Sequence, residues 1–341
     1  MTNVLSCFFP TTVVLVDDNI VFLESLKDYL DIKGVVFKTF ADPLMAVDYV
    51  NEMSSTNRLD YADLIRDGEE SMSDWKSILL NINCLHREIY NPYRFSRVSA
   101  VVSDYLMHGI DGIEMCSRIS NKNIQRILLT GIADEKIAVN AFNDGKIDQF
   151  VKKVTNDFEE EIRNSITGSV YKYFQGHTEN VTKNLSVLGK SHLEDPIFAD
   201  FFFSKCFVNG IVEYYMLDTF GSYLLMDEYG KVSTLSVLTE HEMCRLIEIG
   251  IESDEIASDV LNKLQSRKYM LISHERTGLL PPVSEWSEYL REVNCLDGYQ
   301  TYYVTLSDGS ALDIDIEDIE TFSNFKKRNE DIHASEPKDA W

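Results

Sequence analysis

The stretch Val101-Val102-Ser103-Asp104-Tyr105-Leu106-Met107-His108-Gly109-Ile110-Asp111-Gly112 decides the fold of the N-terminal half. Its apolar start extends back to Val98 and predicts a short buried strand with Asp104 at its C-terminal end. Asp111-Gly112 then closes a loop, and an apolar helical pattern runs to Ile119. A carboxylate at such a strand end points into the crevice where open α/β sheets bind ligands.

Strands and helices alternate on both sides of this stretch. Thr12–Val16 is a β-branched run that predicts another buried strand, and Lys33-Gly34 ends the helix that follows it. The alternation continues, with strands expected at 35–40, 124–129 and 147–153 and helices at 43–50, 113–119 and 133–142. Alternating strands and helices with short connections predict a doubly wound parallel sheet of five strands.

Residues 52–96 interrupt the alternation. Six apolar side chains in this segment share one face if the segment is helical: Trp75, Ile78, Leu79, Ile82, Leu85 and Ile89. An insert with such a face has apolar surface to bury, so we expect it to fold as helices rather than as a loop.

Side chains suited to chemistry gather at the predicted strand ends. Five residues fall at, or just past, the carboxyl end of a strand: Asp17, Asp18, Asp104, Thr130 and Lys153. Parallel strands bring these ends to one edge of the sheet, where three carboxylates repel one another. A hard divalent cation such as Mg²⁺ makes this arrangement tolerable, because it binds oxygen ligands and keeps room for water and a phosphoryl group.

These residue types suit phosphoryl transfer. Asp104 lies at the centre of the predicted sheet and can act as a nucleophile toward phosphorus, forming an aspartyl phosphate. Such a transfer needs positioning and neutralisation of charge more than acid–base groups. Lys153 supplies a positive charge, and the Thr130 hydroxyl can donate to a phosphoryl oxygen.

Each acid taken alone has a simpler interpretation. An Asp at a strand end is usually a helix cap or a solvated turn residue, and this applies to Asp18 and Asp111. His108 is interpreted as a loop residue without a catalytic role. Five suitable residues in the right order at successive strand ends favour the phosphoryl-transfer interpretation.

Residues about 10–156 resemble the receiver domain of two-component response regulators, which has a flavodoxin-like fold. The matching motifs are Asp17-Asp18, Asp104-x-x-Met107-x-x-x-Asp111-Gly112, Thr130-Gly131 and Phe150-Val151-Lys152-Lys153. Lys153 is preferred to Lys152 because it keeps the aromatic-x-x-Lys spacing of the family. This chain departs from the family in its long insert, and in His108 and Val154, where proline is usual.

The resemblance implies a role for each matched residue. Asp104 would be the phosphoacceptor. Mg²⁺ would be bound by four groups: Asp17, Asp18, Asp104 and the Leu106 backbone carbonyl. Thr130 and Lys153 would contact the phosphoryl group, Thr130 and Phe150 would form the switch, and Gly131 would leave the phosphoryl path open. The implied catalysis is limited to self-phosphotransfer and autodephosphorylation, with no dedicated activity in the C-terminal half.

The second half has a different pattern. Residues 157–192 carry an apolar stripe at helical spacing, from Phe158 to Leu188, which fits either an extended fifth receiver helix or a dimer seam. Antiparallel strands are expected at 211–217, 222–226 and 232–238, helices at 240–251 and 254–265, and a hairpin at 299–306 and 311–316. We therefore expect a receiver domain at 1–156, a helical connector at 157–192, an α+β output domain at 193–325 and a loose charged tail at 326–341.

Two short motifs raise an enzymatic alternative for the output domain. Phe220-Gly221-Ser222 and Asp313-x-Asp315 are similar to the Gly-Ser entry and metal pair of nucleotidyltransferases. The acids stand at the wrong spacing, because Asp227 comes too soon after Gly221 and Asp313 too late. A hairpin turn at Gly221 and a solvated strand face at 313–317 explain the same residues.

Composition restricts the class of protein further. The chain of 341 residues has a formal net charge of −24, which argues against a broad basic face for nucleic acid while leaving a local basic patch open. Its 6 cysteines form no C-x-x-C pair and are expected to be reduced core thiols in a cytoplasmic protein. No apolar run approaches the roughly 20 residues that span a membrane.

The combined layout resembles the Legionella-type quorum-sensing response regulators. That resemblance implies Mg²⁺ as cofactor, a sensor histidine kinase as partner, and a homodimer formed on phosphorylation. Two alternatives remain for the output domain: a regulated enzyme that binds or transfers nucleotides, and a nucleic-acid-binding regulator.

Overall fold

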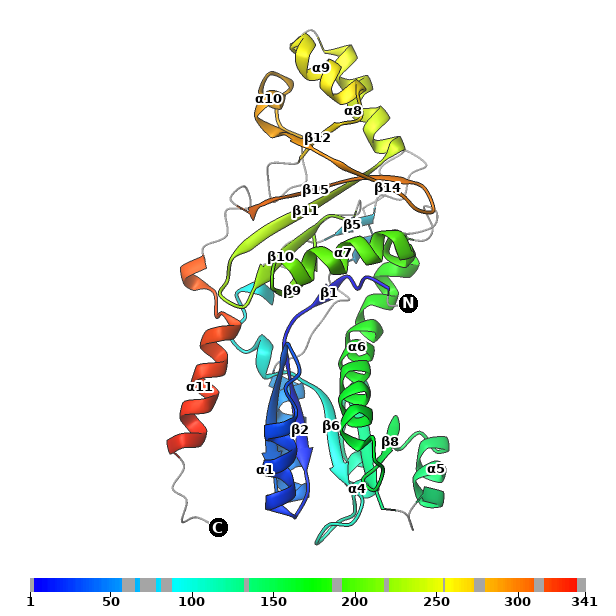
Figure 1. Ribbon diagram of the computed structural model, residues 1–341, viewed down its shortest axis with the longest axis vertical. Coiled ribbons are helices and arrows are strands. Elements are labelled where there is room, and N and C mark those ends of the chain that lie inside the picture. The colour runs from blue at the N-terminus through cyan, green and yellow to red at the C-terminus, as the bar shows by residue number, and fades with distance from the viewer. Residues whose placement is uncertain are drawn as a thin grey trace. The chain divides into compact units, whose positions relative to one another are not determined.

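A computed structural model describes residues 3–56, 65–67, 78–80, 88–131, 135–185, 192–217, 221–253, 255–272, 280–309 and 316–335 (Figure 1). The chain divides into two compact units. The first consists of residues 9–59 and 92–177, and the second of residues 1–8, 60–91 and 178–341.

A five-stranded parallel sheet forms the centre of the first unit (Figure 1). Its strand order is β3-β2-β6-β7-β8, and every pairing is parallel. The bounds are β2 Thr11–Val16, β3 Val35–Phe40, β6 Val98–Asp104, β7 Gln125–Thr130 and β8 Gln149–Lys152. All of β2 is buried, as expected of a parallel strand covered on both faces. The predicted doubly wound sheet is confirmed.

Helices follow these strands as predicted. They are α1 Ile20–Tyr29, α2 Pro43–Thr56, α4 Gly112–Ser117, α5 Glu135–Asn143 and α6 Phe158–Leu185. Polar caps begin two of them: Asn19 accepts from the Phe22 amide at 3.1 Å, and Asp111 from the Glu114 amide at 2.7 Å. Asp111 is thus a helix cap, which is the simpler of the two interpretations that its sequence position allows.

The long helix α6 has 28 residues and carries the predicted apolar stripe through its first half. Ile162, Ile166, Val170 and Phe174 recur every four residues and are buried. The stripe members Val181, Leu185 and Leu188 lie outside the described side chains.

The described middle of the insert, residues 65–67 and 78–80, forms two strands and no helix. β4 Ile65–Asp67 pairs antiparallel with β5 Ile78–Leu80. The prediction that Ile78 and Leu79 belong to a helical face is therefore wrong, because two short apolar segments satisfy their backbone groups by pairing with each other. Trp75, Ile82 and Leu85 lie outside the described residues.

A six-stranded antiparallel sheet forms the second unit. Its order is β1-β9-β10-β11-β15-β14, with β1 Cys7–Phe8, β9 Ile211–Met216, β10 Tyr223–Asp227, β11 Val232–Thr239, β14 Asn294–Asp297 and β15 Thr301–Asp308. The separate antiparallel domain is confirmed. Its edge strand β1 comes from the start of the chain, which the sequence assigns to the first domain, because residues 7 and 8 pair with Tyr215 and Tyr214.

The second unit also contains helices and a separate two-stranded antiparallel sheet. The helices are α7 Pro196–Val208, α8 Glu240–Glu252, α9 Ser258–Gln265, α10 Trp286–Tyr289 and α11 Phe322–Ser335, and β12 Tyr269–Leu271 pairs with β13 Leu290–Glu292. Trp286 is 1% exposed in a core shared by α8 and α9, which lie together in Figure 1.

The structure bears on two further predictions for the second half. β14 pairs antiparallel with β15, and this pairing, with Tyr303 opposite Cys295, was not predicted; the predicted partner strand at 311–316 lies outside the described residues except for residue 316, so that hairpin stays a prediction. The loose tail is wrong for residues 326–335, because α11 continues through them.

Among the described cysteines, Cys7, Cys116 and Cys206 are buried thiols outside any disulfide, as expected of core thiols. Cys295 is also outside any disulfide but exposed, so the expectation of a core position is wrong for it. No helix of the described ranges is both long and apolar enough to cross a membrane.

Candidate functional site

Three of the predicted site residues meet at one edge of the parallel sheet. The Lys153 ammonium lies 2.6 Å from Asp17 Oδ2 and 2.8 Å from Asp104 Oδ1. Asp17 follows β2, Asp104 ends β6 and Lys153 follows β8, so parallel pairing brings together residues that are far apart in sequence. The Lys153 amide donates to the Thr130 carbonyl at 2.9 Å, which fixes the start of the lysine side chain.

The two carboxylates are held in a largely desolvated setting. Asp17 is 2% exposed, and the Asp104 side chain is 14% exposed. Burial raises the pKa of Asp104 above its usual value, while the hydrogen bond and the charge of Lys153 oppose this and the charge of Asp17 adds to it. One ammonium thus faces two carboxylates, and the site keeps an excess of negative charge.

Thr130 ends β7 beside this group and has a feature that the sequence does not reveal. Its hydroxyl is fully buried and has no hydrogen-bond partner among the residues that the structure describes. Buried hydroxyls are nearly always paired, because an unpaired one costs free energy. Because β7 lies between β6 and β8, this hydroxyl belongs to a strand that ends at the same sheet edge as Asp104 and Lys153.

Asp18 does not join the Lys153 cluster. Its Oδ2 accepts from the His108 amide at 3.0 Å and lies 2.5 Å from His108 Nδ1. Within the described residues no three acidic, histidine or cysteine side chains gather closely enough to hold a metal ion. The expected convergence of three carboxylates is therefore incomplete: Asp17 and Asp104 converge, and Asp18 binds the loop after β6 instead.

The remaining predicted residues have distinct surroundings. Lys152 is turned to Glu135, with Nζ 2.9 Å from the carboxylate, so Lys153 is the lysine at Asp104. Phe150 packs against the apolar cluster that includes Cys116 and Ala138. Leu106 is 65% exposed in the loop after β6.

Three features of the site escaped the sequence analysis. The Phe22 ring lies 4.3 Å from Lys153 Nζ, a cation–π contact that the sequence treats only as helix packing. Gly112 has no space for a Cβ, which would overlap the Asp104 carbonyl oxygen. His108 was given no role, although the departure from the usual proline was a visible signal.

The proposed nucleotide motif does not form a site in the described part of the second unit. Asp227 Oδ1 accepts from the Tyr229 and Lys231 amides, both at 2.9 Å, which is a turn-forming role. Gly221 has φ +90°, the conformation of a turn glycine. Asp313 and Asp315 lie outside the described residues.

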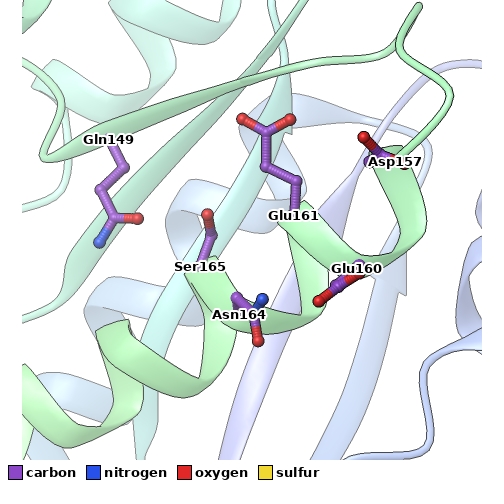
Figure 2. A pocket seen from close by; sticks show the side chains of 6 residues that line it. All are labelled: Gln149, Asp157, Glu160, Glu161, Asn164 and Ser165. Atoms are coloured by element: carbon purple, nitrogen blue, oxygen red, sulfur yellow. The ribbon is translucent and has the colours of Figure 1, made fainter.

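A pocket of about 590 Å³ opens elsewhere on the first unit (Figure 2). Gln149 of β8 lines it from one side, and residues from the start of α6 and just before it line the rest: Asp157, Glu160, Glu161, Asn164 and Ser165. None of the predicted site residues lines this acidic pocket.

Comparison with known proteins gives one strong match. The response regulator LqsR of Legionella pneumophila is similar over 95% of both chains, with 31% sequence identity and a TM-score of 0.77. A response regulator receiver domain from Clostridium thermocellum covers 47% of this chain and 94% of its own length, at 15% identity and a TM-score of 0.31. A CheY-like receiver domain from Methanospirillum hungatei covers 49% and 98%, at 14% identity and a TM-score of 0.32.

The similarity to the Clostridium and Methanospirillum receiver domains is too low to support a functional argument. No family model matches the chain, and no curated protein sequence matches it.

Proposed function

Since this chain belongs to the family of response regulators that includes Legionella LqsR, we propose that it receives a phosphoryl group on Asp104 from a sensor histidine kinase. The observation that carries the proposal is the ion pair of Lys153 with Asp104, together with Thr130 at the end of the strand between them, whose buried hydroxyl has no hydrogen-bond partner among the described residues. A nucleophile, a fixed cation and a free donor are the parts that phosphoryl transfer requires.

The transfer is a displacement at phosphorus. An Asp104 carboxylate oxygen forms a bond to the phosphorus of a phosphohistidine, and the bond from phosphorus to the imidazole nitrogen breaks. The electron pair of that bond stays on the nitrogen of the kinase histidine, which can then take up a proton. Lys153 and Thr130 stabilise the equatorial oxygens by charge and by hydrogen bonding.

The residues present fit a Mg²⁺ cofactor. Lys153 already places a cationic group between Asp17 and Asp104, and hard carboxylate oxygens are the ligands that Mg²⁺ prefers. We assign the ion to four groups: Asp17, Asp18, Asp104 and the Leu106 carbonyl. Bound Mg²⁺ supplies neutralisation of the charge that develops on the phosphoryl oxygens.

The phosphorylated state differs from the free state through Thr130, Lys153 and Phe150. A hydrogen bond to a charged partner contributes about 1.5–3 kcal/mol. Moving a conformational equilibrium from 1:99 to 99:1 requires about 5.5 kcal/mol, so Thr130 alone is too weak. We propose that Thr130, Lys153 and a repacked Phe150 act together, with homodimer formation adding further coupling.

The antiparallel unit is proposed to deliver the output. The similarity to LqsR covers 95% of both chains, which supports a shared layout that includes this unit. We extend this likeness to a proposed role in quorum sensing, in the cytoplasm.

Phosphorylation with a small-molecule acyl phosphate tests the proposal. Intact mass spectrometry should show one added phosphoryl group on the wild type and none on Asp104→Asn. Asp144→Asn is the matched control, because Asp144 is exposed and pairs only loosely with Lys146 at 3.6 Å. Size-exclusion chromatography of the same samples should show a dimer in the phosphorylated wild type and in Asp144→Asn, but not in Asp104→Asn. An added phosphoryl group on Asp104→Asn would contradict the assignment.

A further inference from the structure

We propose that His108 regulates the uptake of the divalent cation, because its backbone amide and its ring both contact one oxygen of Asp18, a proposed ligand of that cation. This inference rests on the proposed function, since it concerns the same site. His108 is a positioning residue in this proposal: it acts through Asp18 and touches neither the phosphoryl group nor the nucleophile.

The contact between His108 and Asp18 joins two loops at the site. Asp18 lies in the loop after β2 and His108 in the loop after β6. One carboxylate oxygen, Asp18 Oδ2, accepts from both the backbone amide and the ring of His108. The carboxylate is an acceptor, so Nδ1 is the nitrogen that carries the proton in this contact.

The other two carboxylates of the site are also occupied. Lys153 contacts both Asp17 and Asp104, so all three acids have a positively charged or N–H partner. A cation that binds Asp18 through Oδ2 displaces two His108 donors from that oxygen.

This competition has a defined thermodynamic sign. If only a fraction of molecules have Asp18 free, the apparent Kd for the cation is the intrinsic Kd divided by that fraction. Weakening the His108 contact raises the free fraction and lowers the apparent Kd. The His108 side chain is 98% exposed, so the effect is modest.

Three substitutions separate the two donors. His108→Ala removes the ring donor and keeps the amide. His108→Pro removes both, because proline has no N–H group. His108→Asn restores a side-chain N–H donor and is the conservative rescue. His241→Ala is the matched control, because His241 is an exposed histidine of the other unit.

Isothermal titration of full-length protein with Mg²⁺, and separately with Mn²⁺, at one fixed pH measures the effect. The Kd should fall by about two- to fivefold in His108→Ala and by about tenfold in His108→Pro. His108→Asn and His241→Ala should match the wild type. Unchanged or weaker binding in both His108→Ala and His108→Pro would overturn the proposal.

Hydrogen exchange of the His108 amide gives a second measurement that needs no substitution. The amide should exchange slowly without metal, because it donates to Asp18, and faster with saturating Mg²⁺. Equal exchange in both states would contradict the proposal.

The acyl phosphate assay on the same wild-type sample separates this proposal from the proposed function. A wild type that gains a phosphoryl group on Asp104, with equal Kd values in all variants, refutes only the His108 role. A wild type that gains none refutes the proposed function itself.

Discussion

At the scale of single residues, two adjacent lysines have different partners. Lys153 lies between two largely buried carboxylates, whereas Lys152 pairs with Glu135 on an exposed face. Successive residues at a strand end point in different directions, so a shift of one position exchanges a site residue for a surface residue.

Replacement of each lysine should therefore have different consequences. Lys153→Ala should slow phosphorylation of Asp104 by about 100-fold, because it removes the fixed charge that faces the transferred group. Lys152→Ala should change the rate by no more than about twofold, since it removes an exposed ion pair. Time courses of intact mass with an acyl phosphate measure both rates. Similar slowing in the two variants would show that position relative to Asp104 is not what matters.

Replacement of Thr130 should raise the stability of the protein and abolish its response to phosphorylation. Thr130→Val should raise the free energy of unfolding of the unphosphorylated protein by about 1 kcal/mol, because it replaces a buried hydroxyl that has no partner. The same variant should lose the response to phosphorylation, since the donor is gone. Urea unfolding measures the first effect and size-exclusion chromatography the second.

The matched control for Thr130→Val is Thr12→Val in the same sheet. Thr12 is equally buried, but its hydroxyl donates to the Phe95 carbonyl at 3.0 Å. This substitution should lower the free energy of unfolding by about 1 kcal/mol, because a hydrogen bond is lost. A loss of stability in both variants would indicate that the Thr130 hydroxyl has a partner after all.

At the scale of secondary-structure elements, the turn before β10 depends on a histidine from a different segment. Gly221 has φ +90°, and a Cβ there would overlap the His192 ring. His192 also packs edge-on against Phe198 of α7, with ring centroids 4.9 Å apart. Gly221, just before β10, and Phe198 of α7 thus both pack against the buried His192 imidazole.

Gly221→Ala should lower the free energy of unfolding by about 3 kcal/mol, from the positive φ and the overlap together. In a His192→Ala background the same change should cost only about 1 kcal/mol, because the backbone cost alone remains. Denaturant unfolding of the four proteins of this cycle measures the coupling. An additive cycle would mean that the ring does not restrict the turn.

At the scale of the whole molecule, one titratable group makes the antiparallel unit sensitive to acid. Burial lowers the pKa of His192 to about 4, with Asp195 and the Gly221 backbone offsetting part of the effect. The native state keeps the ring neutral, whereas the unfolded chain binds a proton below about pH 6.5. Stability is therefore complete above the unfolded pKa and is lost as the pH falls from about 6.5 toward 4.

The loss attributable to His192 should approach about 3 kcal/mol at the acid end of this range. Trp286 is buried in the second unit, so its fluorescence, measured after Trp75 and Trp341 are replaced by Phe, follows that unit. Urea midpoints from fluorescence should shift less with pH in His192→Phe than in the wild type, and His241→Ala should behave like the wild type. Identical pH profiles for wild type and His192→Phe would contradict this prediction.

Prediction from sequence succeeded where the signal was periodic and local. The parallel strands and the antiparallel strands from Ile211 to Leu238 were predictable, because the burial pattern of a strand is visible in neighbouring residues. Prediction failed at Ile78, where a short apolar run fits a helix and a strand equally. It also failed at α11, whose charged sequence gives little apolar pattern.

The sequence by itself determined the alternation of strands and helices and the placement of Asp17, Asp104, Thr130 and Lys153 at strand ends. Side-chain period and chain connectivity are local properties, so they can be read without coordinates. Only the tertiary structure decided that Asp18 binds His108, that Thr130 has no partner and that β1 joins the second sheet. Those outcomes depend on distances between segments that are remote in sequence, and hydrogen bonding and burial act through such distances.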